Sequence, residues 1–254
     1  MTDHTAPIYI APEYAESEAA LRLNGAFYPV TAIDPDTPTL VLDGDGLSLH
    51  AGGQVLRGDF SHLLPRLKNL SGEFLVKAAK IKNAGHPLTA IDATAGLGED
   101  SFFLAAAGFR VRLFERNPVI HALLRDALDR AARMPELTEI IERMELCHGD
   151  SVQAMTGLDF TPDVVLLDPM FPARQKSALV KKKLQMIQKL EQPCLDEGAM
   201  LRTAMLTRPK KLIVKRPPKG PYLAGVKPDH SIEGKAVRFD CFVSPHDRIE
   251  KFKF

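Results

Sequence analysis

The stretch that decides the fold is Ile91-Asp92-Ala93-Thr94-Ala95-Gly96-Leu97-Gly98-Glu99-Asp100, in which a strand end, a glycine loop and a helix start follow one another. Gly96 and Gly98 let the backbone turn sharply and approach a ligand closely, and the first helical turn offers free N–H groups. A dinucleotide-binding loop of this kind carries a third glycine, and Phe102 occupies that position. The loop therefore indicates a ligand at a strand-to-helix turn and by itself leaves the ligand open.

From Leu88 onward, short apolar runs alternate with amphipathic stretches, which is typical of a parallel sheet covered by helices. We expect strands at Leu88–Asp92, Val111–Glu115, Met144–His148, Val164–Asp168, Lys211–Lys215 and Val237–Val243. Apolar residues recur at spacings of three and four in the expected helices, which are Asp100–Ala107, Pro118–Arg133, Pro135–Arg143, Lys176–Leu190 and Pro193–Thr207.

The N-terminal part of the chain differs from the rest in its sequence pattern. We expect residues 1–66 to form a small β-rich lobe and residues 67–254 to form the main domain. Two short strands should flank the turn at 43–46, because its Asp-Gly pairs favour a tight hairpin. Ser71 is expected to cap a helix that continues until Gly85.

Acidic residues follow two further strands of the expected sheet. Glu115 ends the second strand, where a carboxylate can accept both hydroxyls of a ribose, a group that NAD and S-adenosylmethionine share. Asp150 and Ser151 follow the third strand, where the acid can accept from an adenine amine and the serine can add a contact. Taken singly, each acid could equally cap a helix. Together they favour a nucleoside site, because ligands of open α/β sheets bind at this edge.

The segment Asp168-Pro169-Met170-Phe171-Pro172 directly follows a wholly apolar strand. A nucleobase amine is a poor nucleophile, so an acid and a backbone carbonyl that accept its hydrogens can hold it for methyl transfer. Pro169 leaves neighbouring carbonyls free, and Phe171 offers a stacking face for an extruded base. We therefore interpret Asp168, Pro169 and Phe171 as candidate catalytic residues.

With these motifs in place, the sequence resembles the bacterial 16S rRNA guanine-N2 methyltransferases, which modify one guanosine near the 3′ end of small-subunit RNA. The resemblance runs from about Ser71 to Phe242. It is close at Asp92–Gly98, Leu113–Pro118 and Leu167–Lys182, and Val214–Pro217 and Arg238–Asp240 are similar too, whereas the N-terminal lobe matches more loosely.

The resemblance implies a Rossmann-like class I S-adenosylmethionine-dependent methyltransferase fold with a small β-rich N-terminal lobe. It implies S-adenosylmethionine as cofactor, S-adenosylhomocysteine as product and no metal. The activity implied is transfer of a methyl group to the N2 amine of a guanosine in 16S rRNA, within the small ribosomal subunit. The cofactor contacts that the resemblance implies are Glu99, Asp100, Glu115, Arg116, Asp150, Ser151 and Asp168. The glycine loop adds Gly96 and Gly98 to the expected cofactor-binding residues.

Charge is distributed unevenly along the chain. Residues 170–220 contain thirteen Lys or Arg against three Asp or Glu, whereas the first fifty residues contain eight acids and one base. The asymmetry favours one face built for a polyanion, which we expect to be RNA rather than DNA. The residues expected to contact RNA phosphates are Lys176, Lys181, Lys182, Lys215 and Arg216, and Lys210, Lys211 and Lys219 are expected around the same pocket mouth.

Composition narrows the other possibilities. A chain of 254 residues, 45% hydrophobic and 26% charged, is that of an ordinary globular protein. No apolar run is long enough to span a membrane and the N-terminus lacks a secretory pattern, so we expect a cytoplasmic protein. The three cysteines lie far apart and suggest neither a disulfide nor a zinc site.

Three alternatives stay open on the residues alone. A protein amide N-methyltransferase would also need an acceptor pair and an aromatic clamp. An NAD-dependent oxidoreductase would use the same glycine loop and ribose acid. A non-catalytic RNA-binding or assembly factor would use only the basic segment.

Overall fold

The computed structural model describes residues 6–82, 85–169 and 196–251 of the chain. The expected helix at Lys176–Leu190 lies outside these residues, as do Phe171, Lys176, Lys181 and Lys182. Within the described part, no helix is both long and apolar enough to cross a membrane.

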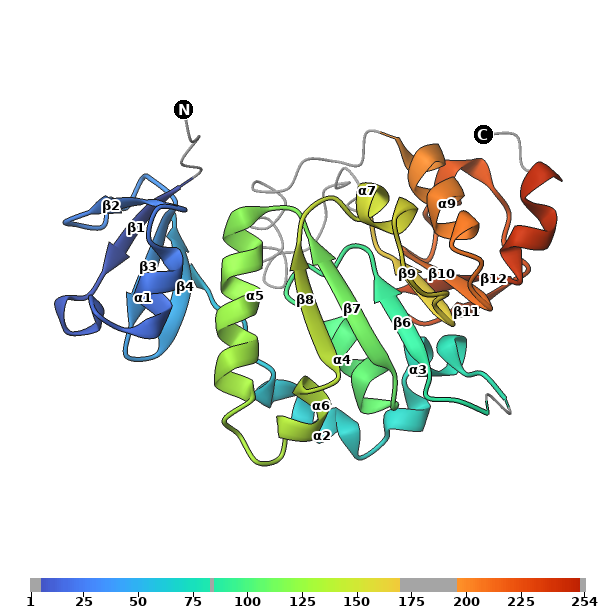
Figure 1. Cartoon of the computed structure of the whole chain (residues 1–254), viewed down its shortest axis with the longest axis horizontal. Helices are drawn as coiled ribbons and strands as arrows, with labels where there is room; N and C mark the ends of the chain where they lie inside the picture. Colours follow the sequence, from blue (N-terminus) through green and yellow to red (C-terminus); the bar gives the residue numbers. More distant parts are fainter. Residues whose placement is uncertain (1–5, 83–84, 170–195, 252–254) are drawn as a thin grey trace.

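The larger of two sheets has seven strands in the order β11-β12-β10-β9-β6-β7-β8 (Figure 1). The five strands from β10 to β8 run parallel, and β12 is antiparallel to both β10 and β11. Their bounds are β6 Thr89–Asp92, β7 Arg110–Glu115, β8 Met144–His148, β9 Val164–Leu167, β10 Lys211–Arg216, β11 His230–Glu233 and β12 Arg238–Val243. All six strands expected from the sequence are confirmed to within one residue at each end, and β11 was missed.

Helices cover both faces of this sheet. On one face lie α2 (Leu64–Leu67), α3 (Phe74–Ala79), α4 (Glu99–Ala106), α5 (Pro118–Ala131) and α6 (Thr138–Ile141); on the other lie α7 (Ser151–Thr156) and α9 (Glu197–Leu206). Alternate residues of β9 serve the two layers: Val164 and Leu166 join the core under α3 and α4, and Val165 and Leu167 join the core under α7 and α9. All four are fully buried, which explains why this central strand is apolar throughout.

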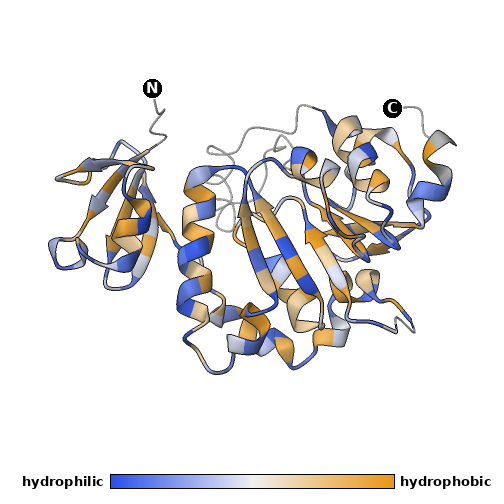
Figure 2. Ribbon diagram, viewed as in Figure 1, coloured by the Kyte–Doolittle hydropathy of each residue, from blue (hydrophilic) through white to orange (hydrophobic). Residues whose placement is uncertain are grey.

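The N-terminal residues form a separate five-stranded sheet in the order β2-β1-β3-β4-β5, joined by the short helix α1 (Glu18–Leu23). The strands are β1 Pro7–Ile10, β2 Tyr28–Val30, β3 Thr39–Asp43, β4 Gly46–Ala51 and β5 Gln54–Leu56. The expected hairpin is confirmed, since Asp43 pairs with Gly46 across the turn and Gly46 has a φ of 101°. Figure 2 shows hydrophobic residues concentrated on the strands of both sheets and alternating with polar ones along α5.

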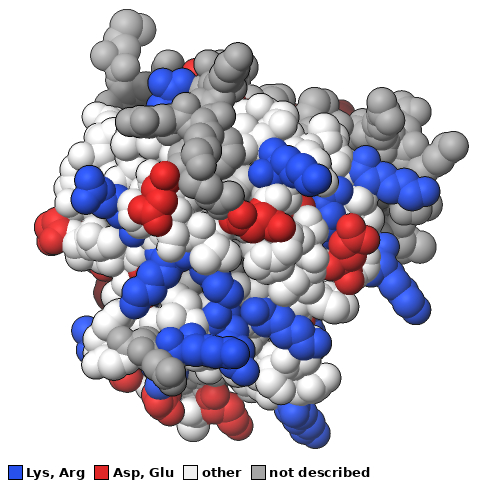
Figure 3. Space-filling model, turned by 90° about the vertical axis from the view of Figure 1, so that its right-hand side faces the viewer, with Lys and Arg blue, Asp and Glu red and all other residues white. Residues whose placement is uncertain are grey.

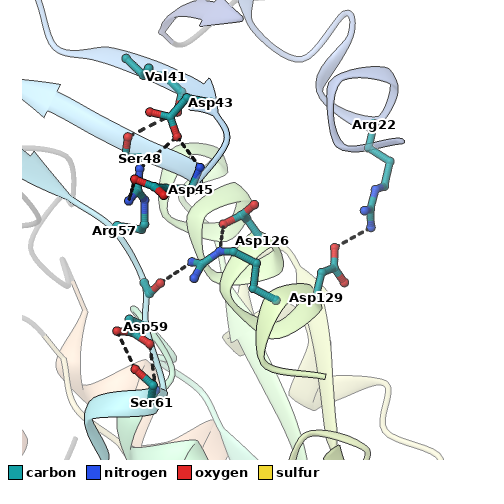
Figure 4. A network of polar contacts seen from close by, with 12 residues as sticks. Arg22, Val41, Asp43, Asp45, Ser48, Arg57, Asp59, Ser61, Asp126 and Asp129 are labelled. Atoms are coloured by element: carbon teal, nitrogen blue, oxygen red, sulfur yellow. Dashed lines mark hydrogen bonds and ion pairs between the residues drawn. The ribbon is translucent and has the colours of Figure 1, made fainter. Parts of the chain in front are cut away.

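Helix α5 joins the two sheets. Its Leu124 and Leu128 pack into the larger core, whereas Val119 and Leu123 pack against the N-terminal sheet. Polar contacts add to this seam (Figure 4): Arg22 of α1 pairs with Asp129 at 2.7 Å, and Arg130 bonds to Asp126 and to the Gly58 carbonyl. The two sheets are therefore held together by one helix with an apolar stripe on each side.

The start of α3 differs from the expectation. Ser71 lies in a separate 3-10 turn, η3 (Leu70–Gly72), and Glu73 occupies the cap position of α3 without a side-chain cap bond. The helix ends at Ala79, because Lys80 leaves helical geometry at ψ 121°. The expectation that Ser71 caps a helix reaching Gly85 was therefore wrong: the backbone N–H of Glu73 bonds to Leu70 and closes a separate turn first.

Candidate functional site at the carboxyl edge of the sheet

The carboxyl ends of five neighbouring parallel strands bring together polar residues that are far apart in sequence. Following the sheet from β10 to β8, these ends carry Lys215, Asp168, Asp92, Glu115 and, just after β8, Asp150. The chain leaves β6 toward β7 on one side, while β9 lies on its other side, so the order of strands reverses here. Open α/β sheets bind ligands at this reversal point.

The glycine loop between β6 and α4 is organised by Asp92. Its carboxylate accepts from the Thr94 N–H at 3.0 Å and from the Ser101 hydroxyl at 2.6 Å. The side chain is almost fully buried, and this burial raises the pKa of Asp92 to about 7. Asp92 therefore fixes the loop to the first turns of α4 from inside the protein.

The two loop glycines have different surroundings. Both have positive φ, 55° at Gly96 and 79° at Gly98. A Cβ atom on Gly98 would lie 2.8 Å from Leu124 Cδ1, so this glycine is required by packing against α5. A Cβ on Gly96 would meet nothing within 4 Å in the described structure, which leaves its backbone accessible to a ligand.

Glu115 ties β7 to the glycine loop. Its side chain is 5% exposed, and its two oxygens accept from the Gly96 N–H at 3.1 Å and the Asn117 N–H at 2.7 Å. Burial raises the pKa of this carboxyl, and the backbone N–H groups oppose that rise. The Arg116 N–H also donates to this carboxylate, and since a carboxylate has about four acceptor positions, the group can still accept from a ligand hydroxyl.

Asp150 caps the N-terminus of α7, which is the helix-cap role that the sequence left open for this acid. One carboxylate oxygen accepts from the Val152 N–H at 2.7 Å and the Gln153 N–H at 3.2 Å. Asp150 itself is exposed and Ser151 is buried beneath it. Near them, the rings of His121 and His148 lie 4.8 Å apart, and burial lowers the pKa of His121 to about 4.

Asp168 sits at the centre of the edge and is held on both its backbone and its side chain. Its N–H donates to the Thr94 hydroxyl at 2.6 Å, which joins β9 to the glycine loop. Its carboxylate pairs with Lys215 Nζ at 3.1 Å, and Lys215 also pairs with Asp100 in the first turn of α4. The Asp168 side chain is 39% exposed, so the carboxylate faces the edge and is not turned into the core. Sequence reasoning missed Thr94, Ser101 and this ion-pair cluster.

The other expected site residues are placed as follows. Glu99 is half-exposed, and its carboxylate lies 3.5 Å from Nε2 of His62. Arg116 is exposed next to Glu115, and Pro169 is buried. Arg216 does not face solvent: its guanidinium donates to the Pro221 carbonyl and lies 3.6 Å from Glu197. Because a phosphate cannot reach a buried side chain, we remove Arg216 from the expected RNA contacts.

A second group of basic residues lies on another part of the described surface. Figure 3 shows Lys and Arg gathered in the lower half of one face, the side of the molecule where α3 and the β11–β12 turn lie in Figure 1. We call this the α3 basic face, and its exposed lysines are Lys77, Lys80, Lys82, Lys210 and Lys235. Lys210 and Lys211 are at the start of β10, at the opposite edge of the sheet from Lys215, so they do not line the pocket mouth.

Comparison with known proteins agrees with this geometry. The family model for SAM-dependent methyltransferases matches residues 37–244. A relative from Thioalkalivibrio sulfidiphilus, named Ribosomal RNA small subunit methyltransferase J, is 42% identical over 91% of this chain and 93% of its own. A relative of the same name from Aeromonas hydrophila is 47% identical over 68% of this chain and 69% of its own. A crystal structure of a SAM-dependent methyltransferase from Neisseria gonorrhoeae superposes with a TM-score of 0.76 at 32% identity, covering 94% of this chain and 96% of that one.

Proposed function

Since this chain belongs to the family of S-adenosylmethionine-dependent methyltransferases, we propose that it methylates the exocyclic N2 amine of one guanosine in 16S ribosomal RNA. Its fold is the Rossmann-like class I fold of these enzymes, as the resemblance predicted. The observation that carries the proposal is the likeness over nine-tenths of the chain to a small-subunit rRNA methyltransferase, combined with Asp168 at the reversal point of the sheet.

The cofactor fits the residues of this edge. The open space above Gly96 leaves room for a ligand to approach the loop, and the first N–H groups of α4 point to the same edge. We assign Glu115 and Arg116 to the ribose of S-adenosylmethionine and Asp150 and Ser151 to its adenine. Gly98, Glu99 and Asp100 are assigned to the rest of the cofactor. When bound, S-adenosylmethionine supplies an electrophilic methyl group.

Asp168 acts on the acceptor amine in this proposal. Its carboxylate and a backbone carbonyl next to Pro169 accept the two amine hydrogens and aim the nitrogen lone pair at the methyl group. Once the new N–C bond forms, the nitrogen carries a positive charge and must lose one proton. The carboxylate of Asp168 is the group placed to stabilise that charge and to take the proton. Phe171 would stack on the extruded base.

An RNA substrate is supported by the surface charge. The α3 basic face is assembled from three segments: Lys211 donates to the Ala78 carbonyl of α3, and the β11–β12 turn packs on Phe74 through Gly234. Among the described residues, no ion pair involves Lys80, Lys82 or Lys235. Lys80 and Lys82 follow the end of α3 that packs on the start of β10, at the other end of the strand from Lys215. Lys235 lies in the β11–β12 turn, beside the carboxyl end of β10, where Arg238 pairs with Arg216. We infer that this face holds RNA outside the nucleotide that is modified.

The decisive experiment measures methyl incorporation from radiolabelled S-adenosylmethionine. Small subunits and naked 16S rRNA from a strain lacking this protein would be compared with a peptide acceptor, followed by mapping of the modified nucleotide. We expect incorporation at one guanosine of the RNA and none into peptide. Label in protein, or in no acceptor despite tight cofactor binding, would contradict the proposal.

A further inference from the structure

The feature that the proposed function leaves unexplained is the lysine between two carboxylates at the ends of β9, β10 and α4. Val214 pairs with Leu167 in the parallel register, so Lys215 and Asp168 are the next residues along both strands. Alternate residues of β10 face the α3 and α4 layer, which directs Lys215 toward the first turn of α4. There its Nζ contacts both Asp100 and Asp168.

The contact with Lys215 affects the pKa of Asp168. The pKa of the Asp168 carboxyl is raised above its ordinary value: removal from water is the largest cause of the rise, Lys215 opposes it, and the neighbouring Asp100 adds to it. Asp92 adds a third acid behind the loop, and Arg216 on β10 contributes a weaker favourable charge. Acids gathered this closely cannot all stay ionised unless a cation lies among them.

Lys215 is itself held in its charged form by Asp168 and Asp100. Burial lowers the pKa of its ammonium, but the two carboxylates outweigh that effect and hold the pKa above its ordinary value. The side chain is 28% exposed, and both of its carboxylate contacts are within the protein. Its charge is therefore directed at the acids of the site, although the sequence favoured a phosphate contact.

We propose that Lys215 is a positioning residue that holds Asp168 ionised and aimed at the acceptor amine. This rests on the role proposed for Asp168. Only the ionised carboxylate carries the negative charge that opposes the positive charge developing on nitrogen, and only this form can take the amine proton. Without Lys215, the pKa of the Asp168 carboxyl would rise further, and the site would need a higher pH to work.

The test compares Lys215→Met, Lys215→Arg and Lys211→Met across pH. Lys211 is the matched control, because it lies on the same strand and face and its ammonium donates to the Ala78 carbonyl. For Lys215→Met we expect kcat at pH 7 to fall about 100-fold, the scale of losing one preorganised partner. The acidic limb of its pH profile should move up by at least about one unit, Lys215→Arg should restore most of the activity, and Lys211→Met should leave the profile in place.

A second variant gives a shift of opposite sign. Asp100→Asn removes the acid that raises the pKa of Asp168, so the acidic limb of kcat should move to lower pH. The proposal is overturned by a wild-type pH profile in Lys215→Met, by an equal shift in Lys211→Met, or by upward shifts in both Lys215→Met and Asp100→Asn.

A readout without turnover separates this proposal from the proposed function. Carbon-13 NMR of labelled aspartate follows the Asp168 carboxyl directly, with Asp168→Asn used to assign its signal. We expect its pKa to rise in Lys215→Met whether or not the wild-type protein methylates RNA. If the pKa of Asp168 is unchanged in Lys215→Met, the role proposed for Lys215 is wrong and the proposed function is unaffected. If the pKa rises as expected but the wild-type protein does not methylate RNA, only the proposed function is wrong.

Discussion

The Gly96 N–H donates to the carboxylate of Glu115 at 3.1 Å, so the end of β7 holds the loop that follows β6. One acid thereby fixes the glycine loop and lies at the same carboxyl edge of the sheet as the proposed cofactor site. Loss of Glu115 should therefore both remove a contact to the cofactor and loosen the glycine loop.

Replacing Glu115 should mainly affect cofactor binding. A hydrogen bond to a charged group contributes about 1.5–3 kcal/mol, so Glu115→Ala should raise the Kd of S-adenosylmethionine about 10- to 100-fold. Isothermal titration calorimetry measures this Kd. Glu145→Ala on the neighbouring strand is the control, since Glu145 is exposed and pairs with Arg112. Equal Kd values in the two variants would remove Glu115 from the cofactor site.

Replacing Asp168 should affect turnover more than folding. Its side chain is partly exposed and its backbone bond to Thr94 does not depend on the carboxylate. We expect Asp168→Ala to lower methyl transfer by about 100-fold or more while the thermal unfolding midpoint stays within a few degrees of wild type. Near-normal single-turnover rates in a folded Asp168→Ala protein would refute the catalytic assignment.

The buried Asp92 carboxyl should make stability depend on pH. Its pKa is raised to about 7 in the folded protein, against 3.8 as the ordinary value, so between these values the native state binds a proton that the unfolded state lacks. The stability from this group is complete below pH 3.8 and is lost as pH rises toward 7, a total on the order of 4 kcal/mol. Urea unfolding of wild type and Asp92→Asn across pH 4–8 measures it, and we expect the asparagine variant to have the flatter profile. Parallel profiles would show that Asp92 ionises normally.

The α3 basic face should contribute to RNA affinity through salt-sensitive contacts. Reversing Lys80 and Lys235 to Glu should weaken binding to small subunits and make the log–log salt slope shallower by about 0.7–0.9 for each lost phosphate contact. Cofactor binding should not change. Arg133→Glu, an exposed charge in the turn after α5, is the control, and an equal effect there would show that only net charge matters.

The seam between the two sheets should be sensitive to volume at Gly58. A Cβ at this position would lie 2.7 Å from Ala127 Cβ on α5, so Gly58→Ala should cost about 1–3 kcal/mol of unfolding free energy. Gly157→Ala is the matched control, because a Cβ there would meet nothing within 4 Å. Equal midpoints in chemical denaturation for the two variants would contradict close packing at the seam.

Much of the larger sheet could be predicted from the sequence because its signals are local. The strand at Met144–His148 was placed at its observed bounds, and the apolar run at Val164–Leu167 correctly indicated a strand buried on both faces. Parallel strands then bring their carboxyl ends to one edge whatever the loops between them do. Asp168, Glu115 and the glycine loop were therefore found at neighbouring strand ends, as expected.

The sequence by itself determined which residues end the parallel strands, because strand period and apolar runs are short-range properties. Only the tertiary structure decided what the charges at those ends do. Arg216 is buried against Pro221 and Glu197, and Lys215 contacts Asp100, which is 115 positions away in the chain. The sequence around a basic residue is the same whether its side chain faces solvent or contacts an acid. Its partner is set by the packing of distant elements and not by its neighbours in sequence.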